Sequence, residues 1–165
     1  ADDVNLLLAS DHGHGPVETA LYADRLLPDV ASSGEGGILY VAALEGPARR
    51  DAQARLADHG VVPLDARPLP DDVAPRVAAF LAPDRVAFET APAEAPEGAL
   101  SGPPAYPSTH GARPGAASDD RFLVAVGPDV PRRDVDAAGP ADVEATLAAL
   151  IGLDPGGQGR SLLDG

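Results

Sequence analysis

The sequence has no cysteine, and this absence excludes several kinds of site. Without thiols the chain forms no disulfide, no thiolate metal centre and no cysteine nucleophile. Methionine, tryptophan and lysine are also absent, so all 12 basic side chains are arginines. No apolar run approaches the roughly 20 residues that a membrane-spanning helix needs, and no signal peptide is evident. We therefore expect no membrane span.

The charge balance excludes a further class of partner. The 165 residues include 26 acidic and 12 basic side chains, which gives a formal net charge of −14. A chain this acidic repels a phosphate backbone, so no nucleic-acid polymer is expected as a partner. The length suits one domain or a large piece of one, and an apolar content of 44% is enough to form a buried core.

Short apolar runs and helix-ending residues predict the secondary structure. Strands are expected at residues 4–9, 38–43, 86–89 and 121–126. Helices are expected at residues 48–58, 71–81 and 140–151. We expect strands 4–9 and 121–126 to share a sheet. The last helix should pack on that sheet through Val143, Leu147, Leu150 and Ile151.

Strands that alternate with helices predict an α/β fold. Between the strands at 86–89 and 121–126 lies a stretch, 91–118, that contains six prolines and almost no branched apolar residue. Loops of this length in a compact domain are usually functional or disordered. The stretch is therefore a candidate for part of a site.

The first candidate site is Asp11-His12-Gly13, at the carboxyl end of the strand at 4–9. Ligands of open α/β sheets bind at that edge. Carboxylate and imidazole are good ligands for a divalent transition metal. Gly13 would let the chain turn sharply, so that the two adjacent side chains can face the same site.

The motif alone is weak, because all four histidines of the chain are followed by glycine. Asp58-His59-Gly60 repeats the tripeptide, but it follows a predicted helix, where a cation and a glycine cap are expected. We therefore interpret His59 as a helix-end residue. His14 is interpreted as an exposed turn residue, with contact to a substrate as the alternative.

The second candidate is His110, within Pro107-Ser108-Thr109-His110-Gly111. A lone loop histidine is more often a surface residue. The order of motifs along the chain favours a site residue instead. A strand that ends in Ser10-Asp11-His12-Gly13 is followed by Thr109-His110-Gly111, and then by residues 120–128 and 142–163. This order resembles the alkaline phosphatase superfamily, most closely its type I phosphodiesterase and nucleotide pyrophosphatase branch. The resemblance covers residues 4–15 and 107–163 best.

The resemblance implies a three-layer αβα sandwich with a central, mostly parallel sheet. Residues 1–165 would form the C-terminal part of such a hydrolase domain, and residues 36–92 a smaller α/β insertion. In that family two zinc ions flank a Thr or Ser nucleophile. By resemblance Asp11 and His12 would bind the ion that contacts the nucleophile, and His110 would bind the other.

The same resemblance implies that the nucleophile and the remaining ligands lie upstream of Val4, so no catalytic residue is expected in this chain. We expect the full-length form to be a metal-dependent phosphodiesterase, nucleotide pyrophosphatase or phosphatase that acts on a small phosphate ester. The isolated chain should be inactive. An extracytoplasmic location is favoured only because members of the resembled family are usually found there.

Several alternatives stay open. A Ser-His-Asp triad with Ser10 or Ser108 fits the composition, but no Gly-x-Ser-x-Gly elbow is present. A sulfatase or a metal-dependent phosphoglycerate mutase belongs to the same superfamily. A non-catalytic module that keeps the fold is the alternative from another class, and the second ligand motif at His110 argues against it.

Overall fold

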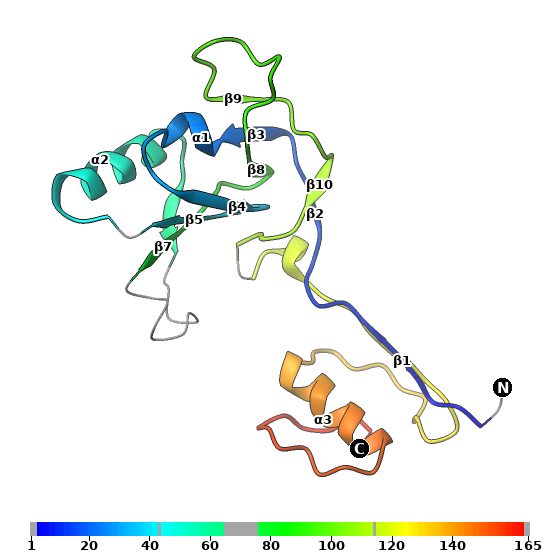
Figure 1. Cartoon of the computed structure of the whole chain (residues 1–165). Coiled ribbons are helices and arrows are strands. Elements are labelled where there is room, and N and C mark those ends of the chain that lie inside the picture. Colours follow the sequence, from blue (N-terminus) through cyan, green and yellow to red (C-terminus); the bar gives the residue numbers. More distant parts are fainter. Residues whose placement is uncertain (1–2, 43, 65–75, 114, 164–165) are drawn as a thin grey trace. The chain divides into compact units, whose positions relative to one another are not determined.

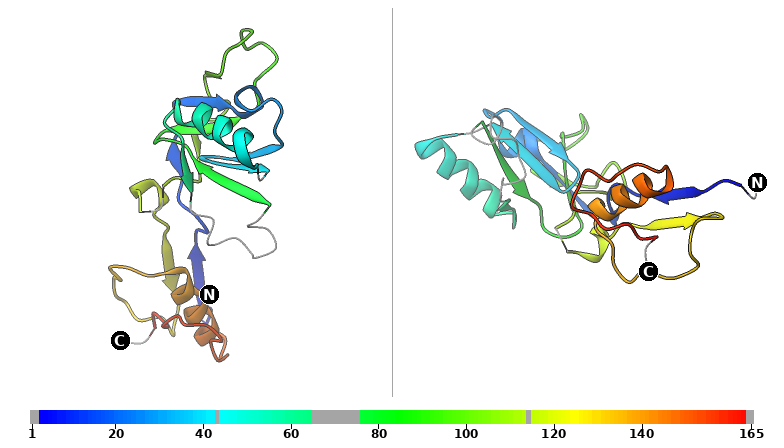
Figure 2. Two further views of the ribbon diagram at one scale, coloured as in Figure 1. Left: turned by 90° about the vertical axis from the view of Figure 1, so that its left-hand side faces the viewer. Right: turned by 90° about the horizontal axis from the view of Figure 1, so that it is seen from below.

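A computed structural model describes residues 3–42, 44–64, 76–113 and 115–163 (Figure 1). Its internal contacts divide the chain into two compact units. The larger unit is His12–Asp120, and the smaller unit combines Ala1–Asp11 with Arg121–Gly165. Two further views of the elements are given in Figure 2.

The larger unit contains most of the secondary structure. Its elements are β2 (Gly15–Pro16), β3 (Thr19–Tyr22), α1 (Ala23–Leu26), β4 (Ser32–Glu35), β5 (Ile38–Ala42), α2 (Gly46–Ala57), β6 (Val62–Leu64), β7 (Val77–Leu81), β8 (Val86–Glu89), β9 (Ser101–Gly102), β10 (Ser108–Thr109) and the 3-10 helix η1 (Ala117–Asp119).

These strands form small sheets, most of them antiparallel. One sheet has four antiparallel strands in the order β4-β5-β7-β6. A second has the order β8-β3-β9, in which β3 and β8 run parallel and β9 runs antiparallel. Strands β2 and β10 pair separately as a short antiparallel ladder.

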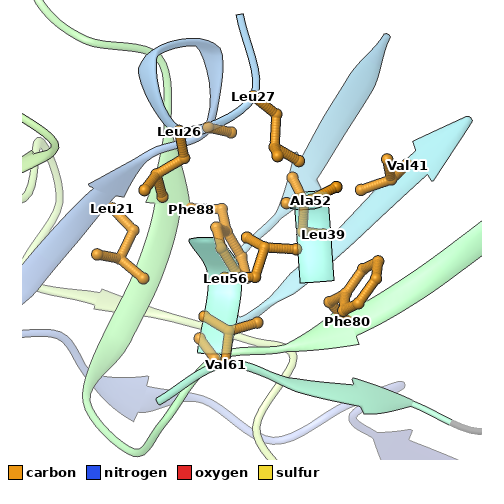
Figure 3. Packing of buried hydrophobic residues seen from close by; sticks show 12 residues of the cluster. Leu21, Leu26, Leu27, Leu39, Val41, Ala52, Leu56, Val61, Phe80 and Phe88 are labelled. Carbon is orange, nitrogen blue, oxygen red and sulfur yellow. The ribbon is translucent and has the colours of Figure 1, made fainter. Parts of the chain in front are cut away.

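The core of the larger unit lies between its sheets and its two helices (Figure 3). Leu39 of β5 and Leu56 of α2 are both fully buried, at 0% exposure. In Figure 3 Leu56 projects from α2 toward Phe88 of β8. Leu26 and Leu27, at the end of α1, belong to the same cluster. Burial of these side chains holds α1 and α2 on the sheets, because each contributes roughly 1.5–3 kcal/mol when removed from water.

The smaller unit consists of a two-stranded ribbon and a helix. Strand β1 (Leu6–Ala9) pairs antiparallel with β11 (Leu123–Val126), and α3 (Pro140–Leu150) lies alongside the ribbon in Figures 1 and 2. The register sets Leu6 opposite Val126 and Leu8 opposite Val124. Opposite residues share a face of the ribbon. All four of these side chains are more than half exposed.

The C-terminal tail is tied to α3 by polar bonds. Asp142, in the first turn of α3, accepts hydrogen bonds from the backbone amides of Gly139 and Arg160, both at 2.8 Å. Thr146 Oγ1 accepts one from the amide of Leu162 at 2.9 Å and donates to the carbonyl of Asp142 at 2.6 Å. Ala145, Thr146 and Leu162 are buried together in this region.

The predicted fold class is wrong. The described residues form four small, mostly antiparallel sheets with three short helices, and they do not form an αβα sandwich around a central parallel sheet. One cause is the helix expected at 71–81, because Val77–Leu81 is strand β7 between β5 and β6. A strand paired on both edges and buried on both faces reads as a continuous apolar run, which periodicity cannot separate from a helix. Residues 71–75 of that prediction lie outside the described residues.

Other elements are confirmed within a few residues: the strands at 4–9, 38–43, 86–89 and 121–126, and the helices at 48–58 and 140–151. Strands β1 and β11 do share a sheet. The packing expected for α3 is wrong at Leu147 and Ile151, which are 48% and 62% exposed, whereas Val143 and Leu150 are half-buried. Among the described residues, no helix is long and apolar enough to cross a membrane.

Candidate functional site

The β2–β10 ladder brings together the two motifs singled out in the sequence. Gly15 pairs with Thr109 and Pro16 pairs with Ser108. The amide of Val17 extends the ladder by donating to the carbonyl of Pro107 at 2.9 Å. Because β2 directly follows His14 and β10 directly precedes His110, the ladder places both histidine segments at one end (Figure 1).

Three imidazole rings gather there. The ring centroids of His12 and His110 lie 4.6 Å apart, with 38° between the ring planes. The rings of His12 and His14 are stacked at 6.4 Å. His12 and His14 are exposed and His110 is half-buried. All three belong to the larger unit, so their arrangement depends on that unit alone.

One ring nitrogen of His12 makes a short contact with the backbone. Its Nδ1 atom lies 2.8 Å from the carbonyl oxygen of Gly13. A carbonyl can only accept, so in this contact Nδ1 is the donor. Metal-binding histidines usually donate their other ring N–H to a carbonyl or carboxylate in this way.

The structure requires glycine at position 13 because of a close backbone contact, and not because of the sharp turn that the sequence predicted. Gly13 is not among the glycines with positive φ, so its backbone conformation does not itself require glycine. Instead a Cβ atom at Gly13 would collide with the carbonyl oxygen of Ser118 and lie 2.6 Å from Asp119 Cα. The segment that carries His12 therefore packs directly against η1.

The backbone of His110 is held by the turn between β4 and β5. The amide of Gly37 donates to the carbonyl of His110 at 3.1 Å, and a Cβ at Gly36 would collide with the same oxygen. Gly111 has a φ of +78°, a conformation that favours glycine. Nothing near His110 in the sequence predicts this contact, although the consecutive glycines at 36 and 37 are an ordinary signal of a turn.

His14 also has a defined partner. Its Nε2 atom lies 3.0 Å from Ser108 Oγ, across the ladder. An imidazole–hydroxyl contact is the first half of a nucleophile pair. Among the described residues no carboxylate hydrogen-bonds to the other ring nitrogen of His14, so the structure does not complete a triad through Ser108. Ser10 Oγ accepts a hydrogen bond from the amide of Phe122.

The remaining candidates are Asp11 and His59. Asp11 belongs to the smaller unit and is joined to His12 by a peptide bond. His59 lies one residue beyond the C-cap of α2, and its amide bonds to the carbonyl of Leu56 at 3.1 Å, as expected for a helix-end residue. Gly60 then follows with a φ of +74°. His59 thus has the structural position predicted for it.

The cluster has the donors for a transition metal but does not enclose an ion as it stands. In the part of the chain that the structure describes, no three His, Asp or Glu side chains are close enough together to hold a metal ion. The rings of His12 and His110 nevertheless lie 4.6 Å apart, and imidazole nitrogen suits Zn²⁺, Cu²⁺ and Ni²⁺ better than Mg²⁺ or Ca²⁺.

Comparison of the sequence with models of known protein families and with curated proteins finds no match.

Proposed function

We propose that this chain supplies metal ligands to a two-metal phosphoric ester hydrolase: a phosphodiesterase, a nucleotide pyrophosphatase or a phosphatase. The observation that carries the proposal is the 4.6 Å between the rings of His12 and His110. All the elements from β2 to β10 separate these two residues in the sequence. One histidine from each of the two motifs that carry the resemblance to the alkaline phosphatase superfamily thus lies in the larger unit, and their rings are neighbours.

The donor set fits zinc. Neutral imidazole is a common zinc ligand, and carboxylate oxygen is another. In the proposed enzyme His12 and Asp11 hold one ion, and His110 holds the second. When bound, two such ions about 4 Å apart polarise the phosphoryl group and neutralise charge on the attacking and leaving oxygens. The nucleophile is a Thr or Ser on a segment before Val4, as the resemblance implies.

The residues around the ligands would keep them in place. The contact of its Nδ1 atom with the Gly13 carbonyl would orient the His12 ring. The amide of Gly37 fixes the backbone of His110. The net charge of −14 attracts cations and repels polyanions, so the proposed substrate is a small phosphate ester.

The test compares two histidine variants in the full-length form. We expect His110→Ala to lower zinc content and the rate of phosphodiester hydrolysis by orders of magnitude, because a lost ligand disturbs the electrostatics of both ions. His59→Ala is the matched control, because His59 lies just beyond the end of α2 and has a structural role there that involves no metal. Atomic absorption gives the zinc content. Equal zinc content and equal rates in the two variants would contradict the proposal and favour a non-catalytic module.

A second measurement tests the place of the nucleophile. The purified 165-residue chain should not hydrolyse a chromogenic phosphodiester. Turnover by this chain that a chelator abolishes would show that the nucleophile lies within it.

A further inference from the structure

The two-stranded ribbon of the smaller unit, β1 with β11, has one exposed apolar face (Figure 1). Paired residues share a face, and every second residue along each strand returns to it. We call this surface the outer face; its six residues are Val4, Leu6, Leu8, Phe122, Val124 and Val126. Each of the six is more than half exposed. The outer face is therefore a continuous apolar surface that lies open to water.

The opposite face of the same ribbon differs in burial. Leu7 of β1 and Leu123 and Ala125 of β11 point to that side, and all three are half-buried. A two-stranded ribbon alone is at best marginally stable in water, and it needs a further layer against its apolar side. Within the described residues, the outer face is the side of the ribbon that most needs such a layer.

The size of the outer face is sufficient for contact between two identical chains. Six large apolar side chains at this exposure offer roughly 500–600 Å² on each copy, so two copies would bury roughly 1,000–1,200 Å² together. Specific protein interfaces begin at about 1,000–1,200 Å² of total buried surface. Exposed apolar patches of several hundred square ångströms usually mark sites of interaction.

Charge favours a second copy over a membrane as the occupant of the outer face. Surfaces that bind anionic membranes carry basic residues beside the apolar ones. This chain has no lysine and a net charge of −14. None of the six side chains is polar or charged, so a second copy needs only the same apolar face and no opposite charge. Repulsion between two acidic copies is screened beyond about 8 Å at physiological salt.

We propose that the outer face is the contact surface of a symmetric dimer of this chain. A two-fold axis brings the same residues of both copies together. The two ribbons stack face to face about 10 Å apart, so each supplies the layer that the other lacks. The centre of the contact lies between the Leu6–Val126 and Leu8–Val124 pairs. The histidine cluster belongs to the larger unit, so the dimer and the proposed function stand or fall separately.

Sedimentation velocity of the full chain tests the dimer. We expect a species with the mass of two 16.7 kDa chains, whose share rises with concentration up to a plateau. Val124→Asp should weaken the dimer at least about 100-fold, because the contact would bury an unpaired carboxylate. Val124→Thr keeps the branched shape, so it should weaken the dimer less and still fold if the charged variant does not. Circular dichroism checks the fold of each variant. Val62→Asp is the matched control, since Val62 is a 40% exposed strand residue of the larger unit, and it should leave the dimer intact.

Cross-linking locates the contact within the dimer. Because the chain has no cysteine, Val124→Cys introduces a single thiol, and a bismaleimide should join two copies through it. Val62→Cys is the control and should not be joined. Added salt should tighten the dimer, because it screens the repulsion between two acidic chains. A monomeric wild type would overturn the inference, whether or not the face then binds vesicles or another polypeptide. Growth into large aggregates without a dimer plateau, or a dimer that Val124→Asp and Val124→Thr both leave intact, would also overturn it.

Discussion

The amide of Gly37 donates a hydrogen bond of 3.1 Å to the carbonyl oxygen of His110, which joins the β4–β5 turn to the histidine cluster. The same turn is bonded to the sheets of the larger unit, through Phe88 to Gly36 at 2.8 Å and through Ala82 to Gly37 at 2.9 Å. The position of His110 is therefore set by the core, although the residue itself follows a strand of only two residues.

This relationship predicts that Gly36→Ala disturbs the site. The new Cβ would collide with the carbonyl of His110 and lie 2.7 Å from Thr109 Oγ1, so the segment that carries His110 must shift. We expect a loss of stability above the roughly 1 kcal/mol cost of a positive φ for a non-glycine residue. Urea unfolding followed by tyrosine fluorescence measures it.

Gly46→Ala is the matched control for that experiment. Gly46 has a φ of +57°, close to the +59° of Gly36, but a Cβ there meets nothing within 4 Å. The two variants thus share the backbone cost and differ only in the collision. Equal loss of stability in both variants would show that a Cβ at position 36 does not displace the segment that carries His110.

The core of the larger unit gives a second prediction. Leu56→Ala should destabilise this unit by about 2–5 kcal/mol, because Leu56 is 0% exposed and its removal leaves a cavity beside Phe88. Leu100→Ala, at a residue that is 38% exposed, should cost much less. Tyrosine fluorescence suits both measurements, since all three tyrosines, Tyr22, Tyr40 and Tyr106, lie in the larger unit. Similar losses would contradict the described packing.

Arg25 gives a third prediction, about the loop at 91–100. Its guanidinium donates to the carbonyls of Pro96 at 2.6 Å and Ala99 at 3.0 Å, and it lies 5.7 Å from the centre of the Tyr22 ring. Arg25→Lys keeps the charge but loses the planar fork that bonds several carbonyls at once. Amide hydrogen exchange in residues 95–99 should rise by up to about tenfold. Unchanged exchange in that segment would show that Arg25 does not hold the loop.

The sequence predicted strand and helix positions better than the way they assemble. Residues 4–9 and 121–126 read as buried strands, and they do pair. Their apolar pattern suggested central strands of a sheet that is covered on both faces, yet Leu6 and Leu8 are 60% and 56% exposed. An apolar run indicates that a strand can be buried, but it does not specify its neighbours or their direction. Pairing direction depends on contacts far apart in the sequence, which periodicity does not contain.

Helix α3 shows the same limit on a smaller scale. The apolar spacing favoured burial of Leu147 and Ile151, whereas the structure buries Ala145 and Thr146. The deciding contacts are polar: Thr146 Oγ1 accepts from the amide of Leu162, and Asp142 accepts from the amide of Arg160. At the candidate site the close approach of His12 and His110 is now described, while metal binding by Asp11, His12 and His110 stays a prediction.

The last prediction concerns pH and the tail bound to α3. Hydrogen bonds from the backbone amides of Arg160 and then Gly139, with a smaller contribution from the charge of Arg160, lower the pKa of Asp142 below its ordinary value. A carboxyl group whose pKa is lower in the folded state stabilises that state fully above its unfolded pKa of about 3.9. This stabilisation is lost as the pH falls through the lower, folded pKa.

Asp142→Asn removes the charge and keeps the shape of the side chain. At neutral pH we expect faster amide exchange at Arg160 and Leu162 in this variant than in the wild type, because the tail loses its bonds to a carboxylate. Below the folded pKa the wild-type group is itself uncharged, so the two proteins should become alike. A carbon-13 titration of the Asp142 carboxyl group gives the folded pKa directly. A midpoint at or above the ordinary aspartate value would contradict the proposed role of the two amides, because a carboxylate that accepts both bonds must be harder to protonate than one in water.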